Sequence, residues 1–325
     1  MTPRNPNAKV LMLIIPVCFV LSGGCETIKA TNEAPVIAFE HVPGKLLITI
    51  GGKPFATYVY QDSKIPRAYF AHVKTPSGIQ VTRNHPPIEG KDEMDHATFH
   101  PGIWLTFADI NGNDYWRLRA KTEHEMFVGK PQGGPGRGTF TVSNYYLDTE
   151  ERRIVHEICR YTLLARPTGY MLISESTFSS KEADFYFGDQ EEFGLGVRVA
   201  TPIAVRYGGH ILNAEGLIDE KGVWGKQSDW CDYSGVIDDT LIGMTIMPDP
   251  RNFRRSWYHA RNYGFVAANP FGRNAMKAGP PSKVVVKKGE KFHLGFGVSI
   301  YSAPKGAKVD HNAIYQQYLK EIRVK

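Results

Sequence analysis

The stretch Asp92–Trp116, DEMDHATFHPGIWLTFADINGNDYW, joins a polar loop to an apolar run and a tight turn. The run Ile103–Phe107 is rich in β-branched and aromatic residues, which is typical of a strand. The Asn-Gly pair that follows predicts a hairpin turn, because both central positions of such a turn need φ > 0. The loop before the strand carries His96 and His100. Binding and catalytic residues concentrate on loops held by a rigid scaffold, so this loop is the first candidate for a site.

The rest of the chain repeats the same β pattern. The sequence has 325 residues with 12% aromatics, 32 Gly and 21 Pro, a composition that many short strands and turns would give. No linker or internal repeat divides it. We therefore predict an all-β protein, a large antiparallel β-sandwich over residues 36–325. The predicted strands include Val36–Glu40, Lys45–Ile50, Phe55–Tyr60, Thr139–Leu147, Arg153–Leu164, Tyr170–Phe178, Gly194–Val199, Leu241–Met247, Lys283–Val286 and Phe292–Ile300.

Helical periodicity is clearest at the C-terminus. In Asp310–Lys325 the apolar residues recur at spacings of three and four, which predicts one apolar helix face. Asp310 is a suitable N-cap. We expect this short helix to pack on the side of the sandwich.

The N-terminus predicts export. Residues 1–24 carry basic residues, an apolar run and then small residues, the pattern of a signal peptide. Cys25 follows directly, which favours a lipidated cysteine, with residues 25–35 as a tether; the alternative is an ordinary signal peptide cut nearby. We expect a periplasmic or cell-envelope protein that meets the membrane only through this lipid. Cys159 and Cys231 are then left to pair or to stay as buried thiols.

The charge pattern argues against a nucleic-acid partner. The net charge is +6, but the basic residues are scattered rather than gathered in a stripe. The sequence also lacks a Gly-x-Ser-x-Gly elbow and the glycine patterns of nucleotide-binding loops. It requires no cofactor and does not specify an oligomeric state.

Adjacent carboxylates mark a second stretch, Tyr186–Arg198, YFGDQEEFGLGVR. Glu191 and Glu192 repel each other, so one could have a raised pKa and serve as a general acid or base. The alternative is a solvated acidic turn.

Tryptophans and carboxylates alternate in a third stretch, Trp224–Gly235, WGKQSDWCDYSG. Aromatic rings beside carboxylates suit a sugar, whose ring face stacks while its hydroxyls take hydrogen bonds. Trp230, Asp232 and Tyr233 are therefore candidate substrate-binding residues. The alternative is a pair of core tryptophans.

Arginines crowd a fourth stretch, Asp249–Phe271, which also carries His259 and Asn269. Arg261 and its neighbours could hold an anionic or polyhydroxylated ligand, with His259 as a catalytic candidate. The alternative is a loop whose arginines pair with the acidic stretches.

Two histidines four apart could also bind a metal. His96 and His100 would need a third ligand, for which His259, Glu191 and His85 are candidates. A divalent metal therefore stays open.

Several motifs occur together: DHATFHPGIW with DINGNDYW, FGDQEEFGLGVRVATP, SDWCDYSG and WYHARNYGFVAANPFG. In this combination they resemble the family labelled "methane oxygenase PmoA", largely uncharacterised exported bacterial proteins, over about Ile65 to Ser302. That family's first motif is nearer DHPHHRG, so one of its histidines is missing here. The resemblance implies a β-sandwich and a neighbourhood of sugar-handling proteins. By analogy at the level of fold, a mutarotase-like supersandwich is one arrangement compatible with it. A membrane methane oxygenase needs several spans of about twenty apolar residues, and none follows Leu21, so that activity is not expected.

We predict a carbohydrate-active enzyme, an epimerase, lyase or hydrolase that uses His/carboxylate acid–base chemistry. The predicted catalytic residues are His96, His100, Glu191, Glu192 and His259, and the predicted substrate-binding residues are Asp95, Trp104, Trp230, Asp232, Tyr233, Arg261 and Asn269. One alternative is a non-catalytic lipoprotein that binds glycan through Trp224, Trp230 and Trp257. Another is a metal-dependent oxygenase or hydrolase.

Overall fold

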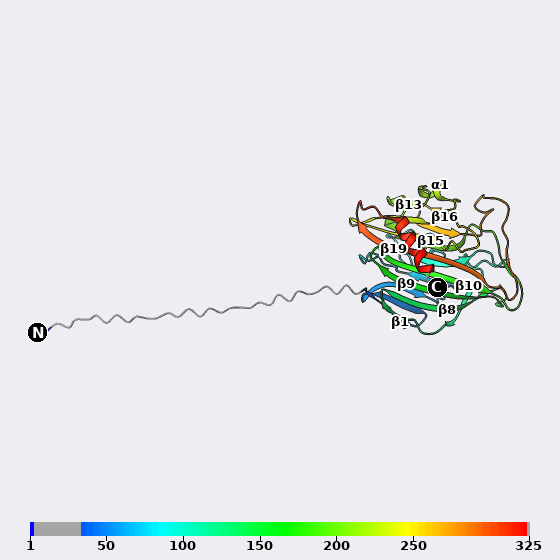
Figure 1. Cartoon of the computed structure of the whole chain (residues 1–325), viewed down its shortest axis with the longest axis horizontal. Coiled ribbons are helices and arrows are strands. Elements are labelled where there is room, and N and C mark those ends of the chain that lie inside the picture. Colours follow the sequence, from blue (N-terminus) through cyan, green and yellow to red (C-terminus); the bar gives the residue numbers. More distant parts are fainter. Residues whose placement is uncertain (3–33, 324–325) are drawn as a thin grey trace. The chain divides into compact units, whose positions relative to one another are not determined.

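Two large antiparallel sheets dominate the computed structural model, which describes residues 1–2 and 34–323 (Figure 1). Within that part of the chain, the first sheet has nine strands. In spatial order they are β16 (Trp257–Arg261), β17 (Phe265–Asn269), β12 (Phe193–Arg198), β5 (Ile103–Phe107), β4 (Tyr69–Ala71), β3 (Lys53–Val59), β2 (Lys45–Ile50), β1 (Val36–Val42) and β7 (Gly134–Pro135).

The second sheet has eight strands within residues 34–323. In order they are β13 (His210–Asn213), β14 (Cys231–Ile237), β15 (Thr240–Pro248), β19 (Phe292–Pro304), β10 (Gly169–Ser179), β9 (Arg153–Arg166), β8 (Arg137–Leu147) and β6 (Thr122–Phe127). A small ladder pairs β11 (Phe185–Phe187) with β18 (Val284–Val286). The helices in the described part are α1 (Asp219–Val223) and α2 (His311–Arg323), with 3₁₀ turns η1 (Thr201–Ile203) and η2 (Val205–Tyr207).

Aromatic side chains fill the space between the two sheets. Tyr58 of β3 is fully buried and lies 5.0 Å from Phe140 of β8 and 5.3 Å from Tyr161 of β9, measured between ring centroids. Phe107 of β5 meets Phe178 of β10 at 5.5 Å. Because alternate residues of a strand face opposite sides, each strand gives one row of side chains to this core. The predicted antiparallel β-sandwich is confirmed.

The C-terminal helix α2 forms as the periodicity predicts. Asp310 Oδ1 accepts a hydrogen bond from the Ala313 backbone N–H at 2.9 Å, which caps the helix. Its buried face contains Ile314, Tyr315, Tyr318, Leu319 and Ile322. This face packs against the eight-stranded sheet, so the helix covers part of that sheet from outside (Figure 1).

The predicted hairpin after β5 is only half correct. The turn is present, with Asn111 at φ 52° and Gly112 at φ 84°, and Ile110 bridges Asn113. The chain beyond it does not return as a strand, because Tyr115 and Trp116 bury their rings in the core instead. β5 pairs with β4 and β12, which places the histidine loop beside β12.

The predictions for the N-terminus concern residues outside the described part. The signal peptide over 1–24, the lipid on Cys25 and most of the tether over 25–35 therefore stay predictions; β1 begins at Val36. Ala34–Lys325 form one compact unit. Neither helix within residues 34–323 is long and apolar enough to cross a membrane. Cys159 and Cys231 are both buried free thiols, not a disulfide.

Candidate active site around His96

A buried arginine organises the backbone of the histidine loop. The guanidinium of Arg83 is 1% exposed and donates hydrogen bonds to the carbonyl oxygens of Glu93 at 2.7 Å and Asp95 at 2.6 Å. It also donates to the carbonyls of His96 and His100, both at 3.2 Å. Four carbonyls thus converge on one cation, and charged donors make the stronger hydrogen bonds. The loop is folded around this side chain rather than left to the solvent.

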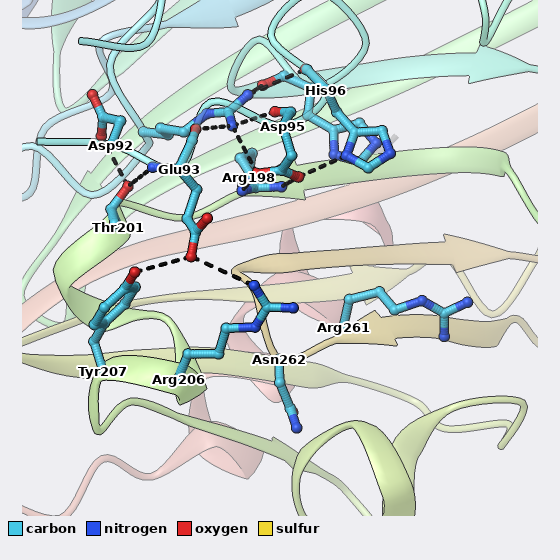
Figure 2. A network of polar contacts seen from close by, with 12 residues as sticks. Asp92, Glu93, Asp95, His96, Arg198, Thr201, Arg206, Tyr207, Arg261 and Asn262 are labelled. Carbon is cyan, nitrogen blue, oxygen red and sulfur yellow. Dashed lines mark hydrogen bonds and ion pairs between the residues drawn. The ribbon is translucent and has the colours of Figure 1, made fainter. Parts of the chain in front are cut away.

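The carboxylate of Asp95 is fixed by a second buried arginine. Arg198, at the end of β12, is 1% exposed and donates to both carboxylate oxygens, at 2.6 and 2.8 Å (Figure 2). Burial by itself would raise the pKa of Asp95, but the hydrogen bonds from Arg198 and His96 and the charge of Arg83 outweigh it and lower the pKa to about 2. Asp95 is therefore a carboxylate at neutral pH, held in one orientation.

His96 presents an exposed imidazole next to this carboxylate. Its Nδ1 lies 2.6 Å from Asp95 Oδ2, and its side chain is 42% exposed. Since the ionised carboxylate can only accept, the hydrogen-bond network assigns the proton to Nδ1 and leaves a lone pair on Nε2. The backbone of His96 has φ 48°, an uncommon conformation for a residue with a side chain. Such outliers persist where the surroundings over-determine them, often at functional sites.

The outer edge of the loop is tied to the turns after β12. Thr201 donates its hydroxyl to Asp92 at 2.9 Å, and Tyr207 donates to Glu93 at 2.9 Å (Figure 2). Arg206, which is 55% exposed, lies 3.5 Å from the same Glu93 carboxylate. The loop is thus held on both its inner and outer sides.

Nearly parallel aromatic rings pack against the imidazole of His96. Its ring stacks on His100 with centroids 4.6 Å apart and planes 10° from parallel, and it faces Tyr263 at 5.7 Å. His100 in turn stacks on Phe265 of β17 at 4.5 Å and on Trp104 of β5 at 5.1 Å. Two strands of the nine-stranded sheet therefore set the position of both histidines.

His100 and Trp104 lie too deep to touch a ligand. They are 3% and 2% exposed, and Nδ1 of His100 has no hydrogen-bond partner within the described residues. Burial, with His96 and Arg198 next in effect, holds the pKa of His100 well below its usual range, so the ring is neutral. The predicted catalytic role of His100 and substrate-binding role of Trp104 are replaced by support of the His96 ring.

A second polar group forms around Glu191. Its Oε1 accepts hydrogen bonds from the Trp224 indole at 2.6 Å and from Arg261 at 2.7 Å, and it lies 3.2 Å from Nε2 of His259. Burial alone raises the pKa of Glu191, but His259, Trp224 and Arg261 outweigh it and lower the pKa. His259 is 4% exposed, and burial lowers its pKa. Glu191 is therefore ionised, and its Oε1 is held by Trp224 and Arg261.

The two groups meet through Phe265. The His259 ring packs edge-on against it at 4.9 Å, while the His100 ring stacks on it at 4.5 Å. Tyr263 lies in the same aromatic layer, 6.3 Å from Phe265 and 4.6 Å beneath the Arg198 guanidinium. The loop near residue 96, the acidic turn near 191 and the arginine-rich hairpin near 260 therefore share one face of the fold.

Glu192 and Asn269 stabilise the acidic turn. Glu192 pairs with Arg117, which also binds Asp114 at 3.0 Å. Asn269 is fully buried, and its amide donates to the carbonyls of Gln190 and Glu191 at 2.9 and 3.1 Å. The substrate-binding role predicted for Asn269 is therefore wrong, since no ligand reaches it. Glu192 faces a different partner from Glu191.

The predicted metal ligands do not form a coordination sphere. The described residues contain no group of three His, Cys, Asp or Glu side chains placed to hold a metal. Because imidazole lone pairs lie in the ring plane, the nearly parallel stacking of His96 on His100 keeps their nitrogens from a common centre. His85 is directed elsewhere and packs against Tyr69 at 5.1 Å.

Two predicted substrate-binding residues, Trp230 and Asp232, lie in or beside the other sheet, away from His96. Trp230 is 5% exposed and donates to Asn312 of α2 at 2.9 Å. Asp232 is buried and accepts from Thr245 at 2.8 Å and from Tyr301 at 3.0 Å. Both residues lie in or beside β14 of the eight-stranded sheet, and Trp230 contacts helix α2. The predictions that they bind substrate are therefore wrong.

Tyr233 alternates with Asp232 along β14 and points to the opposite side. Its hydroxyl is fully buried and bonds the backbone N–H of Val205 at 3.0 Å and the carbonyl of Arg261 at 3.2 Å. Tyr233 therefore stabilises the turn after β16 rather than contacting a substrate. The tryptophan strip of the glycan-binding alternative does not form either, because Trp257 is 6% exposed and Trp230 is buried.

The sequence does not single out Arg83 and Arg198, although both hold the loop. The available signal is an arginine within a run that is otherwise apolar, as in Phe193–Arg198, FGLGVR. A fully buried arginine needs hydrogen-bond partners, so such a residue predicts an acceptor nearby. Trp224 is a candidate only in the glycan-binding alternative, and nothing in the pattern distinguishes Tyr263 within its stretch.

Comparison with known proteins shows remote likenesses. GH36 α-galactosidase AgaA from Geobacillus stearothermophilus is 13% identical with a TM-score of 0.41, over 77% of this chain and 40% of that one. The galactosidase domain of the α-galactosidase-sucrose kinase AgaSK gives 10% and 0.42, over 83% and 42%. A GalM/aldose epimerase homologue from C. elegans gives 9% and 0.35, over 83% and 100%.

The chain thus spans about two fifths of the length of the two galactosidase structures. Likeness at these TM-scores assigns no activity, substrate or residue role. The search of curated proteins finds no match. The family of unknown function DUF6807 matches residues 45–313, most of the chain, and the protein belongs to this family.

Proposed function

We propose that the protein is a carbohydrate-active enzyme in which His96 is the general base. The observation that supports this most is the contact between His96 Nδ1 and Asp95 Oδ2 at 2.6 Å, with the carboxylate clamped by Arg198. A carboxylate behind one ring nitrogen fixes the tautomer and stabilises the imidazolium that forms when the other nitrogen takes a proton. Since the His96 side chain is 42% exposed, Nε2 would be the nitrogen that takes the proton.

Proton abstraction from a sugar carbon is the reaction class that fits best. His96 Nε2 would take the proton, and the electron pair of the C–H bond would pass into an adjacent activated group. A proton delivered from solvent to the other face completes an epimerisation, after which the His96 imidazolium releases its proton to solvent. Departure of a group from the neighbouring carbon, protonated by the His96 imidazolium as it leaves, completes a β-elimination. Hydrolysis by two carboxylates fits less well, because Glu191 and Glu192 are engaged by Arg261 and Arg117.

The polar group around Glu191, on the same face of the fold as His96, favours a polyhydroxylated substrate. Trp224 is half-buried and lies near Arg261 and Lys277, whose charged groups are 6.0 and 5.5 Å from its ring centroid. Aromatic faces beside charged donors are a usual means of holding sugar rings and their hydroxyls. We further propose export and lipid anchoring through Cys25, on the N-terminal sequence pattern alone. The resemblance to the PmoA-labelled family also stays a proposal.

The test follows proton exchange in heavy water. A panel of neutral glycosides, uronic-acid glycosides and free aldoses is incubated with the protein and examined by proton NMR for deuterium at carbon, new epimers and unsaturated products. His96→Gln should abolish whichever change the wild type produces. His72→Gln is the matched control, because His72 is also an exposed histidine at positive φ, 55°, but its ring bonds the His85 carbonyl rather than a carboxylate. Equal turnover by wild type and His96→Gln would refute the proposal.

A further inference from the structure

A hollow lies on the other sheet, away from the His96 loop. Its volume is about 290 Å³, and its lining includes Tyr145, Arg153, His156, Ser179 and Lys181. Along β9, Val155, Glu157 and Cys159 are buried in the core, while the residues between them are partly exposed. The hollow therefore lies on the outer face of the eight-stranded sheet. Small-molecule sites begin at about 300 Å³, so it has room for one ring rather than a chain of them.

The wall of the hollow is a row of side chains in register. Tyr145 of β8 pairs with His156 of β9, which pairs with Ser179 of β10. The Tyr145 and His156 rings lie 4.7 Å apart and 25° from parallel, and the Arg153 guanidinium lies 4.0 Å from the centre of the Tyr145 ring. Cross-strand neighbours on one face hold one another in place, so this wall is already formed without a ligand.

A relay of hydrogen bonds orients His156. Ser143 Oγ lies 2.6 Å from Glu125 Oε2 and 2.8 Å from His156 Nε2. A hydroxyl has one proton, which goes to the carboxylate, so the imidazole must donate from Nε2. The other nitrogen, Nδ1, then has a lone pair and accepts from a ligand hydroxyl. Burial lowers the pKa of His156, in keeping with a neutral ring.

The charges around the hollow do not favour an anion. Arg153 is the strongest cation there, but it pairs with Glu123 at 2.5 Å and with Glu125 at 3.5 Å. Lys181 is offset by Glu182, which also lines the hollow. What is left is a set of neutral donors and acceptors, the Tyr145 and Ser179 hydroxyls and the His156 ring. Such a set suits a neutral ring that carries several hydroxyls.

We propose that this hollow binds one neutral sugar unit, as a site separate from the His96 centre and independent of its reaction. The imidazole of His156 accepts from one sugar hydroxyl, and the hydroxyls of Tyr145 and Ser179 exchange hydrogen bonds with others. With such a site the protein can hold one sugar unit of a glycan in this hollow while another unit of the same glycan lies elsewhere on the protein surface.

The test uses two probes that differ only at carbon 6, methyl β-D-glucopyranoside with a hydroxymethyl group and methyl β-D-glucuronide with a carboxylate. Each is titrated into the isotope-labelled full chain, and backbone amide shifts are followed by NMR. The glucoside should shift the amides of residues 145, 156 and 179–181 and saturate, with a Kd of the order of 1 mM. His156→Gln should weaken that binding about tenfold, as expected for one lost hydrogen bond in a preformed site.

Two further variants complete the test. The first distinguishes lost binding from lost folding, and the second distinguishes this hollow from the His96 centre. Tyr145→Phe removes one hydroxyl and should weaken the glucoside several-fold even if His156→Gln does not fold. His96→Gln should bind it as the wild type does, which would hold even if the proposed reaction at His96 were wrong. Absence of shifts at these amides, tighter binding of the glucuronide, or unchanged affinity in both His156→Gln and Tyr145→Phe would each overturn the proposal.

Discussion

Asp95 Oδ2 lies 2.6 Å from Nδ1 of His96, its neighbour in the chain, and the contact exists because the backbone between them is bent into a left-handed conformation. Two residues adjacent in an extended chain would point their side chains to opposite sides. Arg83 holds the carbonyls of this bend, and Arg198 holds the carboxylate. The pairing therefore depends on two arginines that are distant in sequence.

Replacement of His96 by Gln should remove activity while the fold is kept. Gln keeps the polarity and approximate size of the side chain, but it cannot take a proton. General bases contribute about 10²–10⁴-fold to rate, so kcat should fall by at least about 100-fold. The measurement is turnover of whichever glycoside the wild type changes, with thermal unfolding to confirm the fold. His72→Gln should retain wild-type turnover.

The stability of the folded protein should fall as the pH is lowered and Asp95 becomes protonated. Its pKa of about 2 in the folded protein lies below the ordinary value of about 3.9, so protonation favours the unfolded chain. The stabilisation is complete above about pH 4 and disappears as pH falls towards 2. Because the side chain is 31% exposed, we expect it to be worth about 1–2 kcal/mol.

Denaturant unfolding of wild type and Asp95→Asn checks this value. Other carboxylates titrate in the same range, so the informative quantity is the difference between the two proteins. That difference should be largest near neutral pH and should shrink as the pH approaches 3. A difference that stays constant across this range would show that Asp95 is not held as an ion.

Arg83→Lys should loosen the histidine loop without unfolding the sheet. Lysine keeps the charge but cannot reach four carbonyls with a planar fork. Amide hydrogen exchange in residues 93–100 should accelerate by at least about tenfold, since several backbone contacts are lost at once. Amides of β9 and β10 serve as the internal reference and should be unchanged. Unaltered exchange in the loop would contradict the organising role of Arg83.

Asp232→Asn should lower stability and leave activity intact. Asp232 is buried, and an Asn in its place cannot accept from Thr245 and Tyr301 as fully as a carboxylate does. We expect a loss of about 1–3 kcal/mol in the free energy of unfolding. Turnover per folded molecule should match the wild type. A loss of activity as large as that of His96→Gln would restore Asp232 to the site.

Local sequence patterns predict the sandwich and much of its strand content, because alternation and turn chemistry act over a few residues. The C-terminal helix is predicted for the same reason, with Asp310 as its cap. The strand expected after the Asn111 turn fails because long-range burial of Tyr115 and Trp116 overrides a local hairpin signal. Packing between residues that are distant in sequence cannot be predicted from a window of ten residues.

The candidate site is predicted in part. The sequence points to His96, Asp95, Glu191 and Arg261 because each lies in a stretch dense in unusual polar residues, and packing around Phe265 brings their segments to one face of the fold. Burial separates them from the other candidates, and burial depends on which strands become neighbours. The sequence does not distinguish a buried histidine or tryptophan from an exposed one. The order of the strands places His100 and Trp230 in the interior.

The tautomer of His96 tests the central claim most directly, and it needs no substrate. Long-range ¹H–¹⁵N NMR of the labelled protein distinguishes a protonated Nδ1 from a protonated Nε2. We predict that neutral His96 carries its proton on Nδ1, directed at Asp95, and that this preference is lost in Asp95→Asn. A neutral His96 protonated on Nε2 in the wild type would contradict the account, because the exposed nitrogen would then have no lone pair with which to take a proton.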